Sequence, residues 1–240
     1  MAEAIEIRAL TKRFGDTTAL DGLSLTVKEG TCFSLLGVNG AGKSTLITIL
    51  SCLLLPTEGS AALFGKDVVA ERNAVKAMIG VSPQETAVAG NLTAKENLLF
   101  FCDLYGVREK EARTRELIGT FGLESVAEKR AKNLSGGFQR RLSIALALVH
   151  RPKILFLDEP SLGLDVLSRR ELWDLIRSLS GVTVMLTTHY MEEAEALSDR
   201  VGILSQGALK AVGTPQELIG RTGAGSFEDA FVSLVKEDRR

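Results

Sequence analysis

The residues between Gly37 and Thr45 have the types and the spacing of a phosphate-binding loop. The run Gly-Val-Asn-Gly-Ala-Gly-Lys-Ser-Thr fits the pattern G-x-x-x-x-G-K-[ST]. Glycines allow a tight turn in which successive backbone N–H groups point into one concavity, and a following helix N-terminus adds partial positive charge. Lys43 can then bind the β- and γ-phosphates of a nucleotide, and the Ser44 hydroxyl can ligate Mg²⁺. The alternative is a chance glycine-rich turn.

The segments on either side favour the phosphate loop over a chance turn. The short, largely apolar segment 32–36 predicts a buried strand before the loop, and 46–50 predicts a buried helix after it. A strand, a loop and a helix in this order are the context that the motif requires. The predicted nucleotide contacts of this loop are Gly37, Asn39, Gly40, Ala41, Gly42, Lys43, Ser44 and Thr45.

Two adjacent carboxylates follow a second apolar segment, 154–157. The tip of a strand beside the phosphate loop is where a further Mg²⁺ ligand is expected, and Asp158 fits that role. Glu159 then comes within reach of a water that attacks the γ-phosphate, as a general base or a water-positioning group. The alternative is an ordinary acidic turn before Pro160.

The stretch from Leu134 to Gln139 contains a serine and two glycines before a helix predicted over 140–149. It therefore supplies a second helix N-terminus with free backbone N–H groups and a hydroxyl. No strand precedes it and the loop has no lysine, so alone it could be a simple N-cap. Together with the phosphate loop and the paired carboxylates, we interpret it as a second phosphate contact.

Composition sets the broad class. The 240 residues include 45% apolar and 25% charged residues, which is typical of a soluble globular protein. The net charge of −1 gives no bulk electrostatic reason to expect a nucleic acid or an anionic membrane surface as partner. The spacing of Cys32, Cys52 and Cys102 predicts buried reduced thiols. We see no secretory signal and no apolar run of ~18 residues, so the chain itself is not expected to cross a membrane.

Periodicity predicts the elements that position these residues. Ile5, Ile7 and Ala9 alternate with polar residues, as do the apolar residues of 23–27, which predicts two half-buried antiparallel strands. Strands and helices then alternate, which predicts a parallel sheet, and helical patterns fill 84–150. The predicted fold is α/β, with a mainly parallel sheet, an N-terminal antiparallel β subdomain and an inserted α-helical subdomain.

The order of these motifs resembles the ATP-binding cassette (ABC) ATPases over nearly the whole chain. The matching elements are the phosphate loop, Gln84, Leu134 to Gln139, Ile154 to Glu159, Ser161 to Asp165, and His189. The resemblance implies a P-loop NTPase core spanning 1–225, followed by a C-terminal helical tail over 226–240. It also implies ATP and Mg²⁺ as cofactors. In this family two cassettes pair head to tail, so Ser135, Gly136, Gly137 and Gln139 are expected to bind the ATP held by the other copy.

The resemblance assigns roles to single residues, although an isolated glutamine or histidine at such positions is usually structural. Phe14 is expected to stack on adenine, where tyrosine is commoner in the family. Gln84 is expected to approach Mg²⁺ and the attacking water and to couple the site to a membrane subunit, and His189 to contact the γ-phosphate. Asp165 is expected at the seam between the cassettes. Phe138 stands where the family commonly has glutamine, which leaves the neighbouring serine and glycines intact.

The segments 187–195 and 226–231 look like the exporter (ABC-2) branch that moves drugs, sodium or lipid-linked sugars. The first hypothesis is therefore a motor subunit that pairs with a second copy, or with a homologous cassette, and with a separate membrane permease. Such a subunit is cytoplasmic, peripheral on the inner face of the cell membrane, and has no nucleic-acid partner.

The second hypothesis is a soluble ABC ATPase that acts in translation, repair or cluster assembly. Against it, the chain has one cassette, no heptads and no cysteine clusters. A kinase or GTPase with a phosphate loop does not explain Leu134 to Gln139. The transported cargo is decided by the membrane subunit, which this sequence does not contain.

Overall fold

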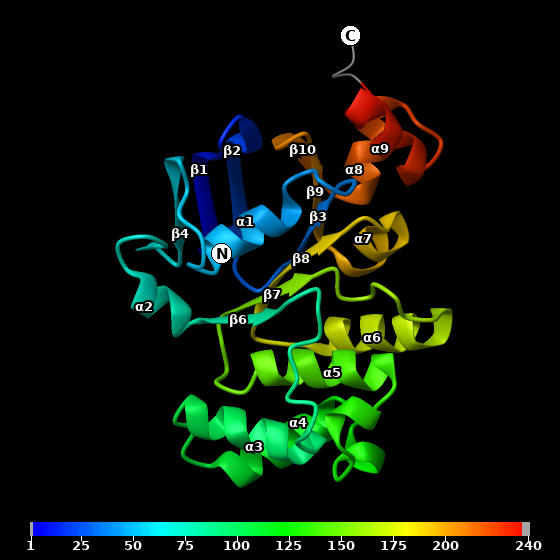
Figure 1. Ribbon diagram of the computed structural model, residues 1–240. Helices are drawn as coiled ribbons and strands as arrows, with labels where there is room; N and C mark the ends of the chain where they lie inside the picture. The colour runs from blue at the N-terminus through cyan, green and yellow to red at the C-terminus, as the bar shows by residue number, and fades with distance from the viewer. Residues whose placement is uncertain (1, 237–240) are drawn as a thin grey trace.

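A six-stranded sheet forms the centre of the computed structural model, which describes residues 2–236 (Figure 1). Its strand order is β10-β9-β3-β8-β7-β6, and every neighbouring pair is parallel except β9 and β10. The strands are β3 (Cys32–Leu36), β6 (Ile79–Ser82), β7 (Ile154–Asp158), β8 (Thr183–Thr188), β9 (Arg200–Ser205) and β10 (Ala208–Gly213). The mainly parallel α/β architecture predicted from the sequence is confirmed.

A second sheet is antiparallel and has the order β2-β1-β4-β5. Its strands are β1 (Glu3–Phe14), β2 (Thr17–Lys28), β4 (Glu58–Leu63) and β5 (Lys66–Asp67). Ile5 and Ile7 are buried, as their alternation predicts, but the predicted burial of Ala9 is wrong. The register shifts between Ile7 and Leu10, and Ala9 adopts φ +45° at this irregularity, so Leu10 faces the core instead.

The helices lie on both faces of the central sheet, and the helix that follows the phosphate loop lies between the two sheets (Figure 1). They are α1 (Lys43–Leu50), α2 (Arg72–Lys76), α3 (Ala94–Leu104), α4 (Lys110–Thr120), α5 (Gly136–Ala147), α6 (Val166–Ser178), α7 (Met191–Leu197), α8 (Pro215–Thr222) and α9 (Phe227–Lys236), with short 3₁₀ turns at Glu124–Val126 and Ala131–Asn133. Leu46, Ile49 and Leu50 of α1 are fully buried in one cluster with side chains of both sheets. This packing fixes the helix that follows the phosphate loop.

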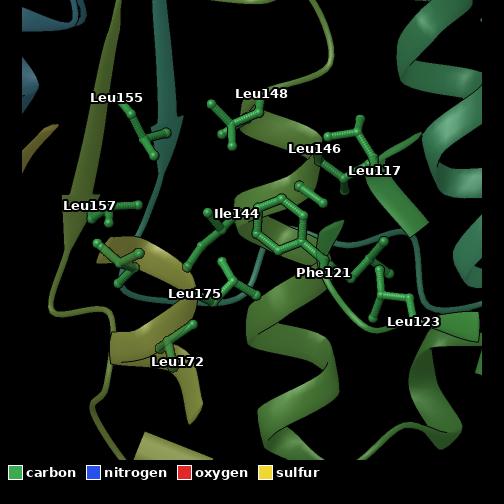
Figure 2. Packing of buried hydrophobic residues seen from close by; sticks show 14 of the residues in the cluster. Leu117, Phe121, Leu123, Ile144, Leu146, Leu148, Leu155, Leu157, Leu172 and Leu175 are labelled. Carbon is green, nitrogen blue, oxygen red and sulfur yellow. The ribbon is translucent and has the colours of Figure 1, made fainter. Parts of the chain in front are cut away.

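The helices predicted between 84 and 150 form two layers below the sheet. α3 and α4 lie outermost, and α5 lies between them and the strands (Figure 1). Figure 2 shows Phe121 and Leu117 from the outer layer meeting Ile144 and Leu146 of α5 in one apolar cluster. The predicted start of this helix at residue 140 is wrong, because α5 begins at Gly136 and includes both glycines of the motif. A serine at the N-cap tolerates glycines in the first turn, which the periodicity of apolar residues does not reveal.

The C-terminal helix α9 packs on the rest of the fold. Phe227, Phe231 and Leu234 lie in one cluster with Leu218 of α8 and Ile203 of β9. The last four residues of the predicted tail, 237–240, lie outside the described residues. Over residues 2–236, none of the helices combines the length and the apolar character needed to span a bilayer.

Candidate nucleotide site

The phosphate-binding loop connects β3 to α1 and packs tightly against neighbouring backbone. A Cβ on Gly37 would lie 2.5 Å from the carbonyl oxygen of Leu204, and a Cβ on Gly42, which has φ +106°, would lie 2.4 Å from that of Ala19. Glycine is therefore required at both positions. The first turn of α1 carries no acidic residue, so its free N–H groups are available to an anion.

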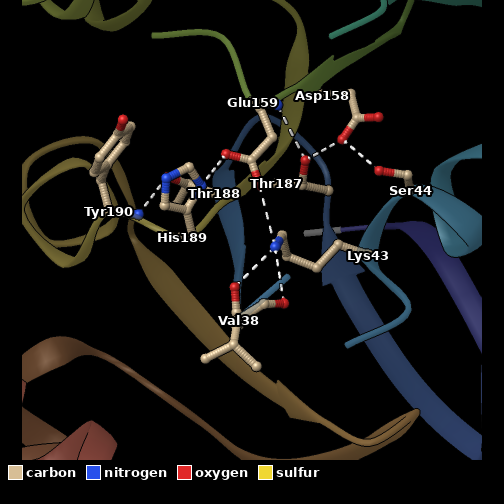
Figure 3. Close-up of polar contacts among 10 residues, drawn as sticks. Val38, Lys43, Ser44, Asp158, Glu159, Thr187, Thr188, His189 and Tyr190 are labelled. Carbon is tan, nitrogen blue, oxygen red and sulfur yellow. Dashed lines mark hydrogen bonds and ion pairs between the residues drawn. The ribbon is translucent and has the colours of Figure 1, made fainter. Parts of the chain in front are cut away.

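Lys43 is buried at the start of α1, and its ammonium has three oxygen partners (Figure 3). It donates to the carbonyl oxygens of Gly37 at 2.8 Å and Val38 at 3.3 Å, and it forms an ion pair with Glu159 Oε1 at 3.1 Å. The two charged side chains are only 6% and 7% exposed, so water screens this pair weakly. The cation that the sequence assigns to phosphate and the carboxylate that it assigns to water activation thus lie side by side.

Glu159 follows β7 directly and is held in an unusual backbone conformation. Its φ is +50°, a left-handed region that non-glycine residues seldom occupy, and its N–H donates to both the carbonyl and the hydroxyl oxygen of Thr187 at 3.1 Å. Its second carboxylate oxygen lies 2.5 Å from His189 Nδ1. Strained conformations of this kind persist where the surroundings over-determine them, and they cluster at functional sites. The tip of β7 therefore presents Glu159 between the phosphate-loop lysine and His189.

Asp158 lies behind the loop and contacts Ser44. The Ser44 hydroxyl donates to Asp158 Oδ1 at 3.1 Å, and the Thr187 hydroxyl donates to the same oxygen. Carboxylate and hydroxyl oxygens are hard ligands of the kind that Mg²⁺ prefers, and Mg²⁺ is commonly held by one or two protein groups together with substrate phosphates. Among residues 2–236, no cluster of three or more His, Cys, Asp or Glu could hold a metal by itself. The oxygen pair fits a site that phosphates would complete.

One cavity of about 410 Å³ collects most of the predicted residues. Its lining consists of Ala19, Asn39, Gly40, Ala41, Gly42, Lys43, Ser44, Thr45, Gln84, Glu159, Leu162 and His189. Gln84, which follows β6, thus reaches the phosphate loop from a distant part of the sequence. The cavity brings together a cation, a carboxylate, an imidazole and an amide around a loop of backbone N–H groups, which is a chemical set suited to phosphoryl transfer.

Phe14 does not line this cavity, whereas two residues that the sequence does not predict, Ala19 and Leu162, do. The Phe14 ring is 49% exposed at the end of β1, with Lys12 Nζ 5.0 Å from its centroid. Its predicted stacking on adenine stays a prediction. Ala19 and Leu162 are small or apolar and carry no chemical signal in the sequence, so only the fold reveals them.

The motif at the start of α5 lies apart from the cavity. Ser135 is the exposed N-cap residue of α5, and its side chain makes no capping hydrogen bond. Gly136 is also exposed, whereas the amide of Gln139 donates to the carbonyl oxygens of Ala131 and Leu134 at 3.1 Å each. The Gln139 amide group therefore supports the preceding loop, while the serine hydroxyl and the first turn face solvent.

Asp165 is the N-cap residue of α6. The sequence predicts it at a cassette seam and does not predict this structural role. Its carboxylate accepts from the N–H groups of Leu167 and Ser168 at 3.0 Å each, and from the Ser168 hydroxyl at 2.7 Å. These hydrogen bonds lower the pKa of Asp165. The carboxylate thereby satisfies N–H groups of the first turn that have no partner within the helix.

A buried glutamate, Glu193, was not singled out from the sequence. It lies on α7, is 0% exposed, and accepts a hydrogen bond from Trp173 Nε1 at 3.0 Å. Burial raises its pKa, the hydrogen bond from Trp173 opposes that shift, and the charge of Glu159 adds to it. A run of acidic residues usually indicates a solvated helix face, so the sequence pattern around Glu193 conceals this position.

Comparison with known proteins identifies the family. The model of the ABC transporter family matches residues 20–162. The probable multidrug ABC transporter ATP-binding protein YbhF of Escherichia coli is 43% identical over 97% of this chain, which spans only 42% of that protein. The daunorubicin/doxorubicin resistance ATP-binding protein DrrA of Streptomyces peucetius is 44% identical over 92% of this chain and 68% of its own length.

Solved structures agree with the sequence matches. An ATP-binding subunit of an ABC transporter superposes with a TM-score of 0.84 at 26% identity, covering 96% of this chain and 99% of that one. The dimeric post-hydrolysis state of the cassette MJ0796, bound to ADP and Pi, superposes with a TM-score of 0.78 at 28% identity, covering 88% and 98%. With its phosphate loop, paired carboxylates and central sheet in this arrangement, the chain belongs to the family of ATP-binding cassettes of ABC transporters.

Proposed function

We propose that this chain hydrolyses MgATP as the motor subunit of an exporter. The observation that carries the proposal is the single cavity in which Lys43, Gln84, Glu159 and His189 meet the phosphate loop. The relatives reported above carry drug-resistance and multidrug-transporter names, which favours this function over a soluble ATPase in translation or repair.

In this proposal the buried ion pair is the resting arrangement of the catalytic residues. Lys43 exchanges Glu159 for the phosphate oxygens of ATP, because a triphosphate carries more negative charge than one carboxylate. The released carboxylate of Glu159 then accepts a proton from, or orients, the attacking water. His189, 2.5 Å from Glu159, holds that carboxylate on the side of the reacting phosphate.

Ser44, Asp158 and Gln84 are the residues that would hold Mg²⁺. When bound, Mg²⁺ would supply positive charge to offset the negative charge of the phosphates. The Ser44–Asp158 hydrogen bond of 3.1 Å keeps the first two oxygens together. Gln84 follows β6 and lines the cavity, so its amide oxygen would be the third ligand.

A second copy, or a homologous cassette, would complete the site. The Ser135 side chain makes no capping hydrogen bond, and Ser135 and Gly136 are exposed, yet both lie outside this chain's own cavity. Head-to-tail pairing would bring Ser135 to Gly137 of one copy onto the nucleotide of the other, with Asp165 near the seam. The dimeric cassette structure cited above supports this arrangement by similarity.

A membrane permease is the proposed second partner, which would hold the chain at the cytoplasmic face of the membrane. A cleft of about 370 Å³, lined in part by Leu53, Ala87 and Phe101, lies between the outer helices and the sheet. Leu104 beside it is 65% exposed. Leu104→Glu should reduce the share of the chain that sediments with membranes and leave ATP turnover unchanged. The control Val69→Glu, at an apolar residue that is 42% exposed, should change neither.

The hydrolysis proposal is tested by Glu159→Gln. This variant should still bind ATP but lose ~10²–10⁴-fold in turnover, because an amide cannot accept the proton. Glu195→Gln makes the same chemical change at an exposed position of α7 and should keep normal turnover. A near-normal steady-state ATPase rate for Glu159→Gln would refute the assignment.

A further inference from the structure

Arg140 lies outside the cavity yet binds the backbone of a residue that lines it. Its Nη1 donates to the carbonyl oxygen of Pro83 at 2.8 Å, and its Nη2 donates to that of Gln84 at 2.6 Å. The residue is 5% exposed, and within residues 2–236 it forms no salt bridge with a carboxylate. Burial lowers the pKa of the guanidinium, and the negative charges of Asp158 and Glu193 oppose that shift. A buried cation is thus used to hold two consecutive carbonyl groups.

The contact is part of a longer seam along one face of α5. Ser143, three residues after Arg140, has its hydroxyl 2.9 Å from that of Ser82 at the end of β6. One turn further, the carbonyl oxygen of Ala147 comes so near Gly80 that a Cβ there would lie 2.0 Å from it. Positions spaced by three and four residues share one helix face, so α5 is held in register along β6 and its continuation.

The first turn of this same helix is the exposed end that begins after Ser135. Arg140 therefore joins the turn that faces outward to the segment that carries Gln84 into the cavity. Only arginine offers a planar fork that reaches two successive carbonyl oxygens while remaining charged. We propose that Arg140 is a positioning residue that links the position of Gln84 in the cavity to the position of the α5 N-terminus of the same chain. It thereby couples the phosphate-loop cavity to the α5 N-terminus, the two parts of the chain that would contribute to different nucleotide sites. This proposal rests on the proposed ATPase function and pairing.

The chain offers a matched control for this contact. Arg113 of α4 is 8% exposed, and it also donates to two consecutive carbonyl oxygens, those of Leu148 and Val149, the latter at 3.1 Å. Its contacts lie at the opposite end of α5, away from Gln84. Arg113→Met and Arg140→Met therefore both remove buried hydrogen bonds to two consecutive carbonyl groups, but only the second removes them beside the cavity. Arg113→Met also removes an ion pair with Glu116 at 2.7 Å, so it is the more disruptive change of the two.

The test is a double-mutant cycle on ATP turnover. Arg140→Met should lower kcat ~10–100-fold, the range seen when a residue that orients a functional group is removed, with little change in KM. In a Gln84→Ala background the same substitution should have almost no further effect, because it acts through Gln84. Arg113→Met should lower thermal stability at least as much, leave kcat close to that of the wild type, and show no coupling to Gln84→Ala. If the fold-losses in kcat caused by Arg140→Met and Gln84→Ala instead multiply in the double variant, the proposal is overturned.

A measurement without ATP separates this inference from the proposed function. Hydrogen exchange of the amides in 84–90 should be faster in Arg140→Met than in the wild type or in Arg113→Met. Equal protection in all three proteins would overturn the positioning role, whatever the ATPase results. A wild-type chain without ATPase activity would instead refute the proposed function, while faster exchange in Arg140→Met alone would still support the anchoring of Gln84.

Discussion

The N-termini of α1 and α5 both offer free backbone N–H groups, but only the first is built into a cavity. At α1, Lys43 and Glu159 form a buried ion pair, and the loop packs against two strands. At α5, Ser135 and Gly136 are exposed, and the serine side chain makes no capping hydrogen bond. The first terminus supplies charge and chemistry, whereas the second supplies a neutral surface with unsatisfied donors. The difference suggests that α5 acts on a ligand that another chain holds.

The largest expected effect comes from the N-terminus of α1, where Lys43 lies. Lys43→Met should abolish ATP binding by the isolated chain, because the phosphates lose their cation and Glu159 keeps only His189 as a partner. Turnover should fall at least ~10²–10³-fold, as when one preorganised donor to a transition state is removed. Titration with a fluorescent ATP analogue and an ATPase assay measure both effects. Lys153→Met, at an exposed lysine beside Phe64, is the control that should leave both unchanged.

A smaller effect is expected at the N-terminus of α5, where Ser135 is uncharged. Ser135→Ala should lower turnover only ~3–10-fold, because it removes one uncharged hydrogen bond. ATP binding to the isolated chain should stay at the wild-type level, since Ser135 lies outside the cavity. Ser60→Ala, also exposed, should change neither value. Weaker ATP binding by the dilute Ser135→Ala chain would mean that α5 contacts the nucleotide of its own chain.

The smallest expected effect is on the pH dependence of stability, and it comes from Glu193, a buried carboxyl group. Burial raises the pKa of Glu193 above its ordinary value of 4.5. The folded state then holds this proton more tightly than the unfolded state, so stability falls as pH rises from that value through the raised pKa. Glu193→Gln stays neutral and should flatten the decline. Thermal unfolding midpoints of both proteins across this pH range measure it, and parallel profiles would contradict a raised pKa of Glu193.

The sequence predicts the residues that do chemistry better than the residues that support them. Lys43 and Glu159 were found because charged groups at a strand end and in a glycine loop have few structural explanations. Arg140 and Glu193 were not found, because their roles depend on burial by elements far apart in the chain. The start of α5 was placed too late, since glycines in a first turn hide a helix from its apolar periodicity. Ala9 was placed on the wrong face because a bulge reverses the alternation of β1.

The central claim is that each site is completed by the α5 N-terminus of a second copy, and mixing two inactive variants tests it directly. In a mixed pair of Lys43→Met and Ser135→Arg chains, head-to-tail pairing puts both substitutions in one site and leaves the other site intact. The arginine is chosen because its bulk should block the nucleotide contact that alanine only weakens. Mixing should then restore about a quarter of the wild-type ATPase rate, because half of the randomly formed pairs are mixed and each has one intact site. No gain on mixing, with mixed pairs shown to form, would contradict the claim.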